Sequence, residues 1–516
     1  MARKNSNGAK APMTTAQSLS SLIKSARDIM RKDKGLNGDL DRLPLLTWIM
    51  FLKFLDDLEI QREEEATLAK NKFRAVIEAP YRWRDWAANP QGITGDELLA
   101  FINQDDTVRP DGQKGMGLFA YLRQLTSSNG DDRREVVATV FRGVDNRMKS
   151  GYLLRDVINR VGGIHFTSSD ELHTLGALYE TMLREMRDAA GDSGEFYTPR
   201  PLVRFMVEVT DPRLGEKILD PAAGTGGFLV EAFKHLSNQV KTVADRRLLQ
   251  EHSLTGFEPK TLPYLLCQMN LLLHGLDAPL IDSGNALRFK LTEIGEKDRV
   301  DVILTNPPFG GEEERGILGK FPEDMQTAET ALLFLQLIMR KLKRRAPRKT
   351  SGGRAALVVP DGTLFNVGIA ARIKEHLVKN FNLHTIVRLP FGVFEPYTPI
   401  RSNILFFDVS GSTETTWFYE IIMPDSRKKY TKTKPLRYEE FEDCIKWWSI
   451  REANENAWSV NIGDIIAKGF NLDFPNPRRP DAELPDDPNE LMSLISSNQK
   501  RISDSLEALL TILRDL

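Results

Sequence analysis

The stretch EKILDPAAGTGGFLVEAF, residues 216–233, decides the fold class of this chain. Its apolar start, glycine-rich middle and apolar end predict a β-strand, a tight loop and an α-helix in succession. Further apolar, β-branched runs alternate with helical patterns downstream: HSLTGFEP (252–259), RVDVILTNPPF (299–309), GRAALVVPDGTLF (353–365), LHTIVRLPFGVF (383–394) and, last, SNILFFDV (402–409). This alternation predicts an α/β fold with a doubly wound, mostly parallel, Rossmann-like sheet over residues 166–410.

The segments on either side of this domain have other patterns. Residues 15–165 carry apolar side chains at helical spacing and no convincing strand, so we expect an all-helical N-terminal domain after a disordered tail at 1–14. Residues 411–474 are expected to form a C-terminal extension, and 475–516 a Pro-rich linker and a helical tail. The apolar seam of that tail consists of Leu491, Ile495, Ile502, Leu506, Leu509, Leu513 and Leu516, with the polar Asn498 among them. Such a seam suits a coiled coil with a partner helix, and packing on the same chain is the alternative.

The composition limits the class of protein. The chain has 516 residues and a net charge of −2, so a nucleic acid would have to be bound by local patches or through a partner. The two cysteines, Cys267 and Cys444, lie far apart, so we expect no disulfide framework and no metal site, and a reducing cytoplasm fits. The basic start has no apolar signal-peptide core, and the longest apolar runs are too short to span a membrane.

The loop DPAAGTGGF, Asp220–Phe228, is the first candidate binding site. Small residues let the backbone approach a ligand closely, and free N–H groups at the start of the next helix can hold an anion. Nucleotides, dinucleotides and S-adenosylmethionine all use such loops, but this one lacks the lysine of a P-loop and the spacing of a dinucleotide fingerprint. Glu258 ends the next predicted strand, where a carboxylate can accept both ribose hydroxyls; a carboxylate that starts a helix is the alternative.

The motif TNPPF, Thr305–Phe309, is the second candidate site. It follows a buried strand, so it should lie at the carboxyl edge of the sheet, where ligands of such folds bind. The prolines fix the backbone and leave their carbonyls free, and Asn306 adds a side-chain oxygen. Two acceptors and the flat face of Phe309 suit a planar ring with an –NH2 group. The two acceptors could also make the nitrogen of that group nucleophilic towards the methyl group of a sulfonium, and no metal would be required. A DNA base would have to flip out of the duplex to reach such a pocket.

In this order, DPAAGTGGF and NPPF resemble the amino-methyltransferases that act on N6 of DNA adenine, and GEFYTPRPLVRFMV (194–207) resembles their segment that lines the S-adenosylmethionine pocket. With the helical N-terminal domain, GALYETML and LPFGVFEPYTPIRSNILFF, the chain resembles the methylation subunit of type I restriction-modification systems, the HsdM family, over about residues 15–475. The resemblance implies an adenine-specific DNA methyltransferase of a prokaryotic cytoplasm that uses S-adenosylmethionine. It also implies a specificity subunit that reads the DNA and is held by two methylation subunits, and a restriction subunit that can join them.

Carried over residue by residue, the resemblance implies that the target adenine is held by Asn306, Pro307, Pro308 and Phe309. It places cofactor contacts at Glu195, Phe196, Tyr197, Thr198, Pro199 and Arg200, and in the loop at Ala223, Gly224, Thr225, Gly226 and Gly227. Asp220 is expected at the methionine end of the cofactor and Glu258 at its ribose. Asn285 stands where the family often has an acidic residue near the cofactor adenine, so its role stays open.

Other enzyme classes share parts of this pattern. A protein-glutamine N-methyltransferase could use the same clamp, but the segment GEFYTPR and the helical domain argue against it. An enzyme for N4 of cytosine usually has Ser where this chain has Asn306, and a DNA-binding relic would carry a damaged loop or clamp. A methylase that works without a partner is a further alternative, and the target sequence lies in another polypeptide if the partner exists.

Two clusters of basic residues each have two interpretations. YRWRDW (81–86) combines arginines with aromatic rings, which suits either nucleic-acid contact or a packed surface knob. The run RKLKRRAPRK (340–349) suits either phosphate contact or a solvated helix C-terminus favoured by the helix dipole.

Overall fold

The computed structural model describes residues 16–126, 132–164, 198–309, 313, 315–345, 352–394, 400–424, 429–431 and 434–479, and the single positions 492, 496, 499 and 503. The expected tail at 1–14, the motif GALYETML and every residue of the C-terminal seam lie outside these residues. Glu195, Phe196 and Tyr197 also lie outside them.

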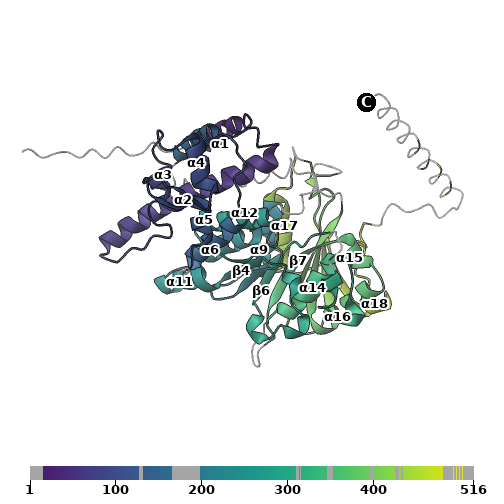
Figure 1. The fold of residues 1–516 in the computed structure, drawn as a ribbon. Coiled ribbons are helices and arrows are strands. Elements are labelled where there is room, and N and C mark those ends of the chain that lie inside the picture. Colours follow the sequence, from purple (N-terminus) through teal and green to yellow (C-terminus); the bar gives the residue numbers. More distant parts are fainter. Residues whose placement is uncertain are drawn as a thin grey trace, which may run out of the picture.

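The N-terminal domain is mainly helical, as the apolar spacing predicts (Figure 1). Its helices are α1 (Ala16–Met30), α2 (Asp39–Leu68), α3 (Trp83–Trp86), α4 (Gly95–Asn103), α5 (Leu118–Arg123), α6 (Asp132–Arg142) and α7 (Gly151–Gly162). The prediction that it holds no strand is wrong, because β1 (Asp106–Val108) and β2 (Lys114–Met116) form an antiparallel hairpin. The signal was the turn sequence Pro110-Asp111-Gly112, whose glycine has a φ of +81°.

The described part of the second domain is built on one sheet with the strand order β11-β10-β8-β9-β7-β6-β3-β4-β5. The strands are β3 (Ile218–Asp220), β4 (Leu254–Phe257), β5 (Leu280–Asp282), β6 (Val302–Thr305), β7 (Arg354–Pro360), β8 (Asn382–Arg388), β9 (Ser402–Asp408), β10 (Thr415–Glu420) and β11 (Ala457–Asn461). From β7 to β5 all neighbours are parallel, whereas β9 lies antiparallel between β7 and β8. The predicted α/β fold with a mostly parallel sheet is therefore confirmed.

The prediction that residues 402–409 form the last strand is wrong. Strand β10 pairs in parallel with β8, and β11 pairs antiparallel with β10, so the sheet continues past residue 410 as far as Asn461. The segment TTWFYE of β10 is rich in β-branched and aromatic residues, which is a strand signal in itself. Strand β5 was also not predicted, because only three residues, LID, carry its pattern.

Helices cover both faces of the sheet, so the strands are apolar on both sides. On β6, Val302 and Leu304 belong to one buried cluster and Ile303 to another, in keeping with the alternation of side chains along a strand. The remaining helices are α9 (Arg200–Thr210), α10 (Gly227–Ser237), α11 (Val243–His252), α12 (Thr261–Leu273), α13 (Arg315–Leu318), α14 (Thr330–Lys341), α15 (Asp361–Phe365), α16 (Ile369–Asn380), α17 (Glu442–Trp448) and α18 (Ile462–Ala467). Apolar residues of α9, α10 and α12 join the first cluster, and those of α14 and α16 join the second.

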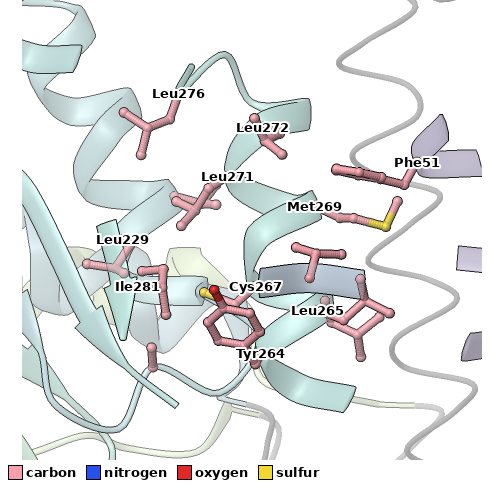
Figure 2. Close-up of a cluster of buried hydrophobic side chains, with 14 of the residues drawn as sticks. Phe51, Leu229, Tyr264, Leu265, Cys267, Met269, Leu271, Leu272, Leu276 and Ile281 are labelled. Carbon is pink, nitrogen blue, oxygen red and sulfur yellow. The ribbon is translucent and has the colours of Figure 1, made fainter. Parts of the chain in front are cut away.

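Helix α12 connects the two domains. Figure 2 shows Phe51 of α2 beside Met269 and Leu265 of α12, while Leu229 and Ile281 of the sheet domain lie on the other side of α12. An ion pair between Arg62 and Asp277 adds a polar contact at the same junction. The helical domain and the sheet domain therefore share one continuous core rather than being joined by a loose linker.

Candidate active site

Three parallel neighbours place the predicted site residues at one edge of the sheet. Strands β6, β3 and β4 are adjacent and parallel, so their carboxyl ends meet. Asp220 ends β3, Asn306 follows β6 and Glu258 follows β4. Residues that are far apart in the chain are thus brought together at the edge where ligands of such sheets bind.

The glycine loop between β3 and α10 depends on the absence of side chains. Gly224 and Gly226 have φ angles of +54° and +79°, a region that other residues rarely adopt. A Cβ atom on Gly226 would lie 2.8 Å from the Sγ atom of Cys267 on α12. The amide of Asn270, also on α12, donates to the Thr225 carbonyl at 2.8 Å. The loop is therefore held against α12, and its shape requires glycine at position 226.

Asp220 is a buried carboxyl group with one satisfied and one unsatisfied oxygen. Its Oδ1 atom accepts hydrogen bonds from the hydroxyl of Thr305 at 2.7 Å and from the Ala222 N–H at 3.1 Å. Its Oδ2 atom is buried and has no partner among the described residues. Burial raises the pKa of Asp220 to about 7, and the charge of Glu258 adds to the rise. An unpaired buried acceptor of this kind favours a ligand that brings a donor or a positive charge.

Glu258 ties the glycine loop to the start of α12. Its Oε2 atom accepts from the Gly224 N–H and its Oε1 atom from the Lys260 N–H, both at 2.9 Å. Burial raises the pKa of this carboxyl group to about 7. The alternative reading as a helix-start carboxylate thus has support, and it is compatible with ligand binding because each carboxylate oxygen can accept a second hydrogen bond.

Asn306 of the NPPF motif contacts the segment ahead of the glycine loop. Its Nδ2 atom donates to the Oγ1 atom of Thr198 at 3.0 Å. Its Oδ1 atom is buried without a partner in the described part of the chain. Phe309 packs edge to face on Phe394, with ring centroids 5.1 Å apart and an interplanar angle of 89°. The amide is thereby oriented so that its acceptor oxygen is left for a ligand.

One small cavity, of about 20 Å³, lies where these segments meet. Among the predicted residues, its walls contain Thr198, Arg200, Asp220, Ala223, Gly224, Thr225, Gly227 and Asn306. Ala222 and Phe228 also line it and were not singled out from the sequence. Arg200 closes one side, because its Nη1 atom donates to the Gly227 carbonyl at 2.9 Å. Thr198 and Arg200, the glycine loop and Asn306 of the NPPF motif therefore line one cavity.

Some predicted residues lie outside this cavity. Pro199 caps the start of α9, and Gly226 caps the start of α10. Asn285 accepts from the Leu287 N–H at 2.8 Å and thereby caps a short 3-10 helix, and its Nδ2 atom lies 3.3 Å from the Glu313 carboxylate. Its acceptor oxygen thus has a structural role, and a cofactor contact at Asn285 stays a prediction.

The supporting roles of three residues, one of them in the TNPPF motif itself, were missed from the sequence. Thr305 holds Asp220, while Asn270 and Cys267 hold the glycine loop. A signal existed for Asn270, since it is one of two amides, with Gln268, within a mainly apolar helix. The structure shows that it is fully buried. Thr305 precedes Asn306 at the end of a buried strand, and only the pairing of β6 with β3 reveals its partner.

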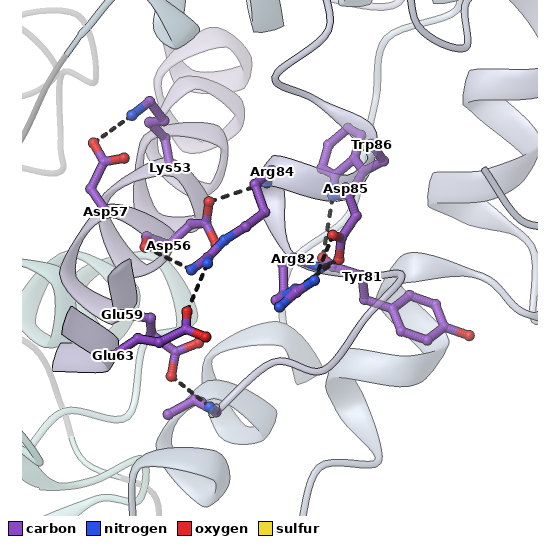
Figure 3. Close-up of polar contacts among 11 residues, drawn as sticks. Lys53, Asp56, Asp57, Glu59, Glu63, Tyr81, Arg82, Arg84, Asp85 and Trp86 are labelled. Carbon is purple, nitrogen blue, oxygen red and sulfur yellow. Dashed lines mark hydrogen bonds and ion pairs between the residues drawn. The ribbon is translucent and has the colours of Figure 1, made fainter. Parts of the chain in front are cut away.

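The two basic clusters have mainly structural contacts. In YRWRDW, Trp83 and Trp86 are buried, Arg84 binds Asp56 and Glu63 of α2, and Arg82 binds Asp85 (Figure 3). The packed-knob interpretation is therefore favoured.

The basic run begins in the last turn of α14, which ends at Lys341. Leu342 forms a β-bridge with Val300, which precedes β6, so the run lies at the end of the sheet opposite to the candidate active site. Lys343 pairs with Asp301, and Arg345 donates to the Ser410 carbonyl. Residues 346–349 lie outside the described residues.

Two further sequence expectations concern metals and membranes. The described residues contain no group of three or more His, Cys, Asp or Glu side chains arranged to hold a metal ion. Among the described helices, none combines the length and apolar character needed to cross a bilayer.

Comparison with known proteins shows the family of this chain. The family model of the N-6 DNA Methylase matches residues 170–485, and that of the HsdM N-terminal domain matches residues 19–161. The EcoEI type I restriction enzyme methylase subunit of Escherichia coli is 48% identical over 506 residues, which cover 96% of this chain and 98% of that protein. The corresponding EcoKI subunit of Escherichia coli K12 is 29% identical over 72% of this chain and 70% of its own length.

Solved structures of type I restriction-modification proteins are also similar to this chain. The crystal structure of a type I modification subunit from Vibrio vulnificus YJ016 is 69% identical, with a TM-score of 0.86, over 91% of this chain and 99% of that one. A chain from a study of complex assembly and conformational transition of the type I restriction-modification system is 38% identical, with a TM-score of 0.76, over 98% and 99% of the two chains. This chain therefore belongs to the family of type I restriction enzyme methylase subunits and is an adenine-specific DNA methyltransferase of that class.

Proposed function

We propose that this chain transfers the methyl group of S-adenosylmethionine to N6 of an adenine that is flipped out of DNA, and that a specificity subunit selects the sequence. The observation that carries the proposal is the buried Oδ1 atom of Asn306, which has no partner among the described residues and lies in the wall of the glycine-loop cavity. An acceptor in this position needs an N–H donor, and the exocyclic amine of adenine supplies one.

The residues of the loop fit S-adenosylmethionine. Gly224 and Gly227 let a ligand approach the backbone at the start of α10, and the unpaired Oδ2 atom of Asp220 suits the positive charge of the methionine end. Each oxygen of Glu258 can accept one more hydrogen bond, which suits the two hydroxyls of a ribose. When bound, the cofactor supplies an electrophilic methyl group; the remaining work belongs to the residues of this chain.

The NPPF residues hold and polarise the target base. Thr198 fixes the Asn306 amide, so that its Oδ1 atom can accept one hydrogen of N6. We assign the other hydrogen to the carbonyl of Pro307. Two acceptors on the same amine favour a lone pair that is localised on nitrogen and directed at the methyl donor. Phe309, braced by Phe394, offers a ring for stacking on the flipped base.

The proposed partners are DNA and a specificity subunit, with two copies of this chain for each specificity subunit. Support comes from the similarity over 98% of this chain to a protein studied for the assembly of a type I restriction-modification system. We also propose that a restriction subunit can join the complex, and that the assembly works in a prokaryotic cytoplasm. The C-terminal seam from Leu491 to Leu516 is the segment proposed to reach the specificity subunit.

A direct test uses the full chain with and without a candidate specificity subunit. Each sample is incubated with S-adenosylmethionine and DNA, and the DNA is then digested and its nucleosides are identified by mass. N6-methyladenine that forms only with the partner supports both the chemistry and the delegated sequence reading. N6-methyladenine without the partner would mean a self-sufficient methylase, whereas methylcytosine, or no product from an intact complex, would refute the adenine chemistry.

A further inference from the structure

A second cavity, of about 570 Å³, lies between α14 and α16 on the face of the sheet that these two helices cover. Arg340 and Gln336 of α14, Asn380 and Phe381 at the end of α16, and Arg299 and Arg344 are among its lining residues. Its volume falls within the range of pockets that hold small ligands. Figure 1 shows α14 and α16 side by side next to the sheet.

This cavity is separate from the methyl-transfer site. Arg299 precedes β6 and Asn306 follows it, so the two residues lie at opposite edges of the sheet. The seven residue-to-residue steps from Arg299 to Asn306 correspond to roughly 20 Å of extended chain. A ligand in this cavity therefore does not touch the glycine loop or the NPPF motif.

The cavity is positively charged. Arg299 is 5% exposed, and its Nε atom lies 3.3 Å from the Oε1 atom of Glu296. Arg344 lies 3.3 Å from the same carboxylate oxygen, and Arg340 donates its Nε–H to the Leu291 carbonyl at 2.9 Å. Among the described residues, Glu296 is the only carboxylate that forms ion pairs with these three arginines. Burial lowers the pKa of Arg299; Glu296 opposes this shift, and Arg344 and Arg340 add to it.

Gln336 adds an unpaired acceptor. Its side chain is 4% exposed, and its Nε2 atom donates to the carbonyls of Met325 and Leu332. Since both partners are acceptors, the orientation of the amide is set, and the Oε1 atom is left buried without a partner in the described structure. A ligand here must therefore bring a donor as well as an anion. Met325, Met339 and Phe381 provide an apolar wall for the rest of it.

We propose that this cavity binds a phosphate-bearing ligand of the nucleoside monophosphate class. The phosphate would lie on Arg299, Arg340 and Arg344, because guanidinium groups match the geometry of phosphate oxygens. A hydroxyl or N–H group of the sugar or base would donate to Gln336 Oε1, with the flat ring on the apolar wall. Arg340 and Arg344 of the basic run would then contribute to a small-molecule site rather than to the DNA surface of the active site.

The test is a calorimetric titration of the full chain with thymidine 5′-monophosphate. S-adenosylhomocysteine is present at saturation so that the cofactor part of the methyl-transfer site is filled, and thymine is chosen because it lacks the exocyclic amine that the NPPF motif is proposed to hold. Thymidine and inorganic phosphate are titrated in parallel. We expect thymidine to bind at least tenfold more weakly than its monophosphate, and phosphate to bind more weakly than the whole nucleotide.

Matched variants separate the cavity from the general charge of the run. Arg340→Gln with Arg344→Gln should weaken nucleotide binding tenfold or more. Lys343→Gln with Arg345→Gln removes the same charge from the same run but outside the cavity lining, and should change binding less than threefold. Gln336→Leu should weaken binding of the nucleotide but not of inorganic phosphate, which does not need this acceptor.

Several results would overturn the proposal. One is equal weakening by the two double variants, which would indicate unspecific attraction. Another is thymidine binding as tightly as its monophosphate, or no binding of either at millimolar concentration. A third is that a short DNA duplex binds through Arg340 and Arg344 while the nucleotide does not bind. This result would assign the arginines to nucleic-acid binding. Melting curves of each variant show whether it is folded. If an arginine variant does not fold, Gln336→Leu still tests the proposal.

Discussion

The side-chain amide of Asn306 donates a hydrogen bond to the hydroxyl of Thr198 over 3.0 Å, across 108 residues of chain. Thr198 precedes α9, and Asn306 follows β6, so this contact joins the proposed cofactor segment to the proposed base clamp. It also decides which atom of the amide faces the cavity, because the nitrogen is taken and the oxygen is not. The orientation of the acceptor proposed for N6 therefore depends on a residue that is predicted to contact the cofactor.

Replacing Thr198 with valine should slow methyl transfer more than it weakens cofactor binding. The variant keeps the shape but leaves the Asn306 amide without its acceptor, at a cost of about 1–3 kcal/mol, or roughly a tenfold to hundredfold loss in kcat. Single-turnover assays of the complex measure this loss, and titration with S-adenosylhomocysteine measures cofactor affinity. Thr198→Ser keeps the hydroxyl and serves as the control. If Thr198→Val lost only affinity, the contact would not orient the clamp.

Asn306→Ala removes the proposed acceptor for N6 and should reduce kcat by about a hundredfold to a thousandfold, the range found when one oriented polar group is deleted from an active site. Cofactor affinity should change little, since the loop contacts remain. Methyl transfer to DNA is followed with labelled cofactor. A fully active Asn306→Ala complex would refute the clamp.

Phe309→Ala should have a similar effect through the loss of stacking, which is worth about 1–3 kcal/mol per base. Phe309→Tyr retains the ring and is the matched control. The contrast between the two is measured with a DNA in which the target adenine is replaced by fluorescent 2-aminopurine, whose emission reports base flipping. Equal signals from the two variants would argue against a stacking role.

Cofactor affinity should rise with pH around neutrality. Burial raises the pKa of Glu258 to about 7 and that of Asp220 to about 7, and the two groups titrate as a neighbouring pair. An ionised carboxylate is the better acceptor for ribose hydroxyls and the better partner for a cation, so affinity increases as pH rises through about 7. The dissociation constant of S-adenosylhomocysteine at pH 6, 7 and 8 measures this. In Glu258→Gln the slope should be smaller; an unchanged slope would remove Glu258 from the explanation.

Stability should respond to pH in the opposite direction. A carboxyl group whose pKa is raised in the folded state stabilises the fold below its unfolded pKa, and this contribution is lost as pH rises through about 7. Asp220→Asn removes the titrating group, so the variant should gain stability relative to wild type between about pH 4 and pH 7, by at most about 1.4 kcal/mol per pH unit. Denaturant unfolding across this range tests the sign. A gap that narrows with rising pH would contradict the raised pKa.

Gly226→Ala should damage the cofactor loop selectively. The new Cβ would meet Cys267 Sγ at 2.8 Å, and the φ of +79° costs a further ~1–2 kcal/mol for a residue with a side chain. Affinity for S-adenosylhomocysteine should fall tenfold or more, at roughly 1.4 kcal/mol per factor of ten. Gly316→Ala is the control, because its Cβ would have open space. Cys267→Ala in the same chain should restore part of the affinity by relieving the contact but not the φ strain.

Much of the site could be recognised without coordinates because its signals are local. The glycine loop and the NPPF motif are short, and each has its chemistry within a few adjacent residues. The fold class also follows from local periodicity, since parallel strands covered on both faces read as apolar runs between helices. Strands β5, β10 and β11 were not predicted, because their local signals were short or lay in a segment that was expected to be an extension.

The sequence by itself determined the strand–loop–helix unit around Gly224 and the membership of the α/β class, because backbone freedom and side-chain periodicity are properties of neighbouring residues. Only the tertiary structure decided that Thr198 orients Asn306, that Thr305 holds Asp220, and that α12 supports the loop from the side of the helical domain. It also decided that β9 lies antiparallel between β7 and β8. Strand order, burial and the raised pKa values arise from contacts between distant segments, and their free energies depend on which groups the whole fold removes from water together.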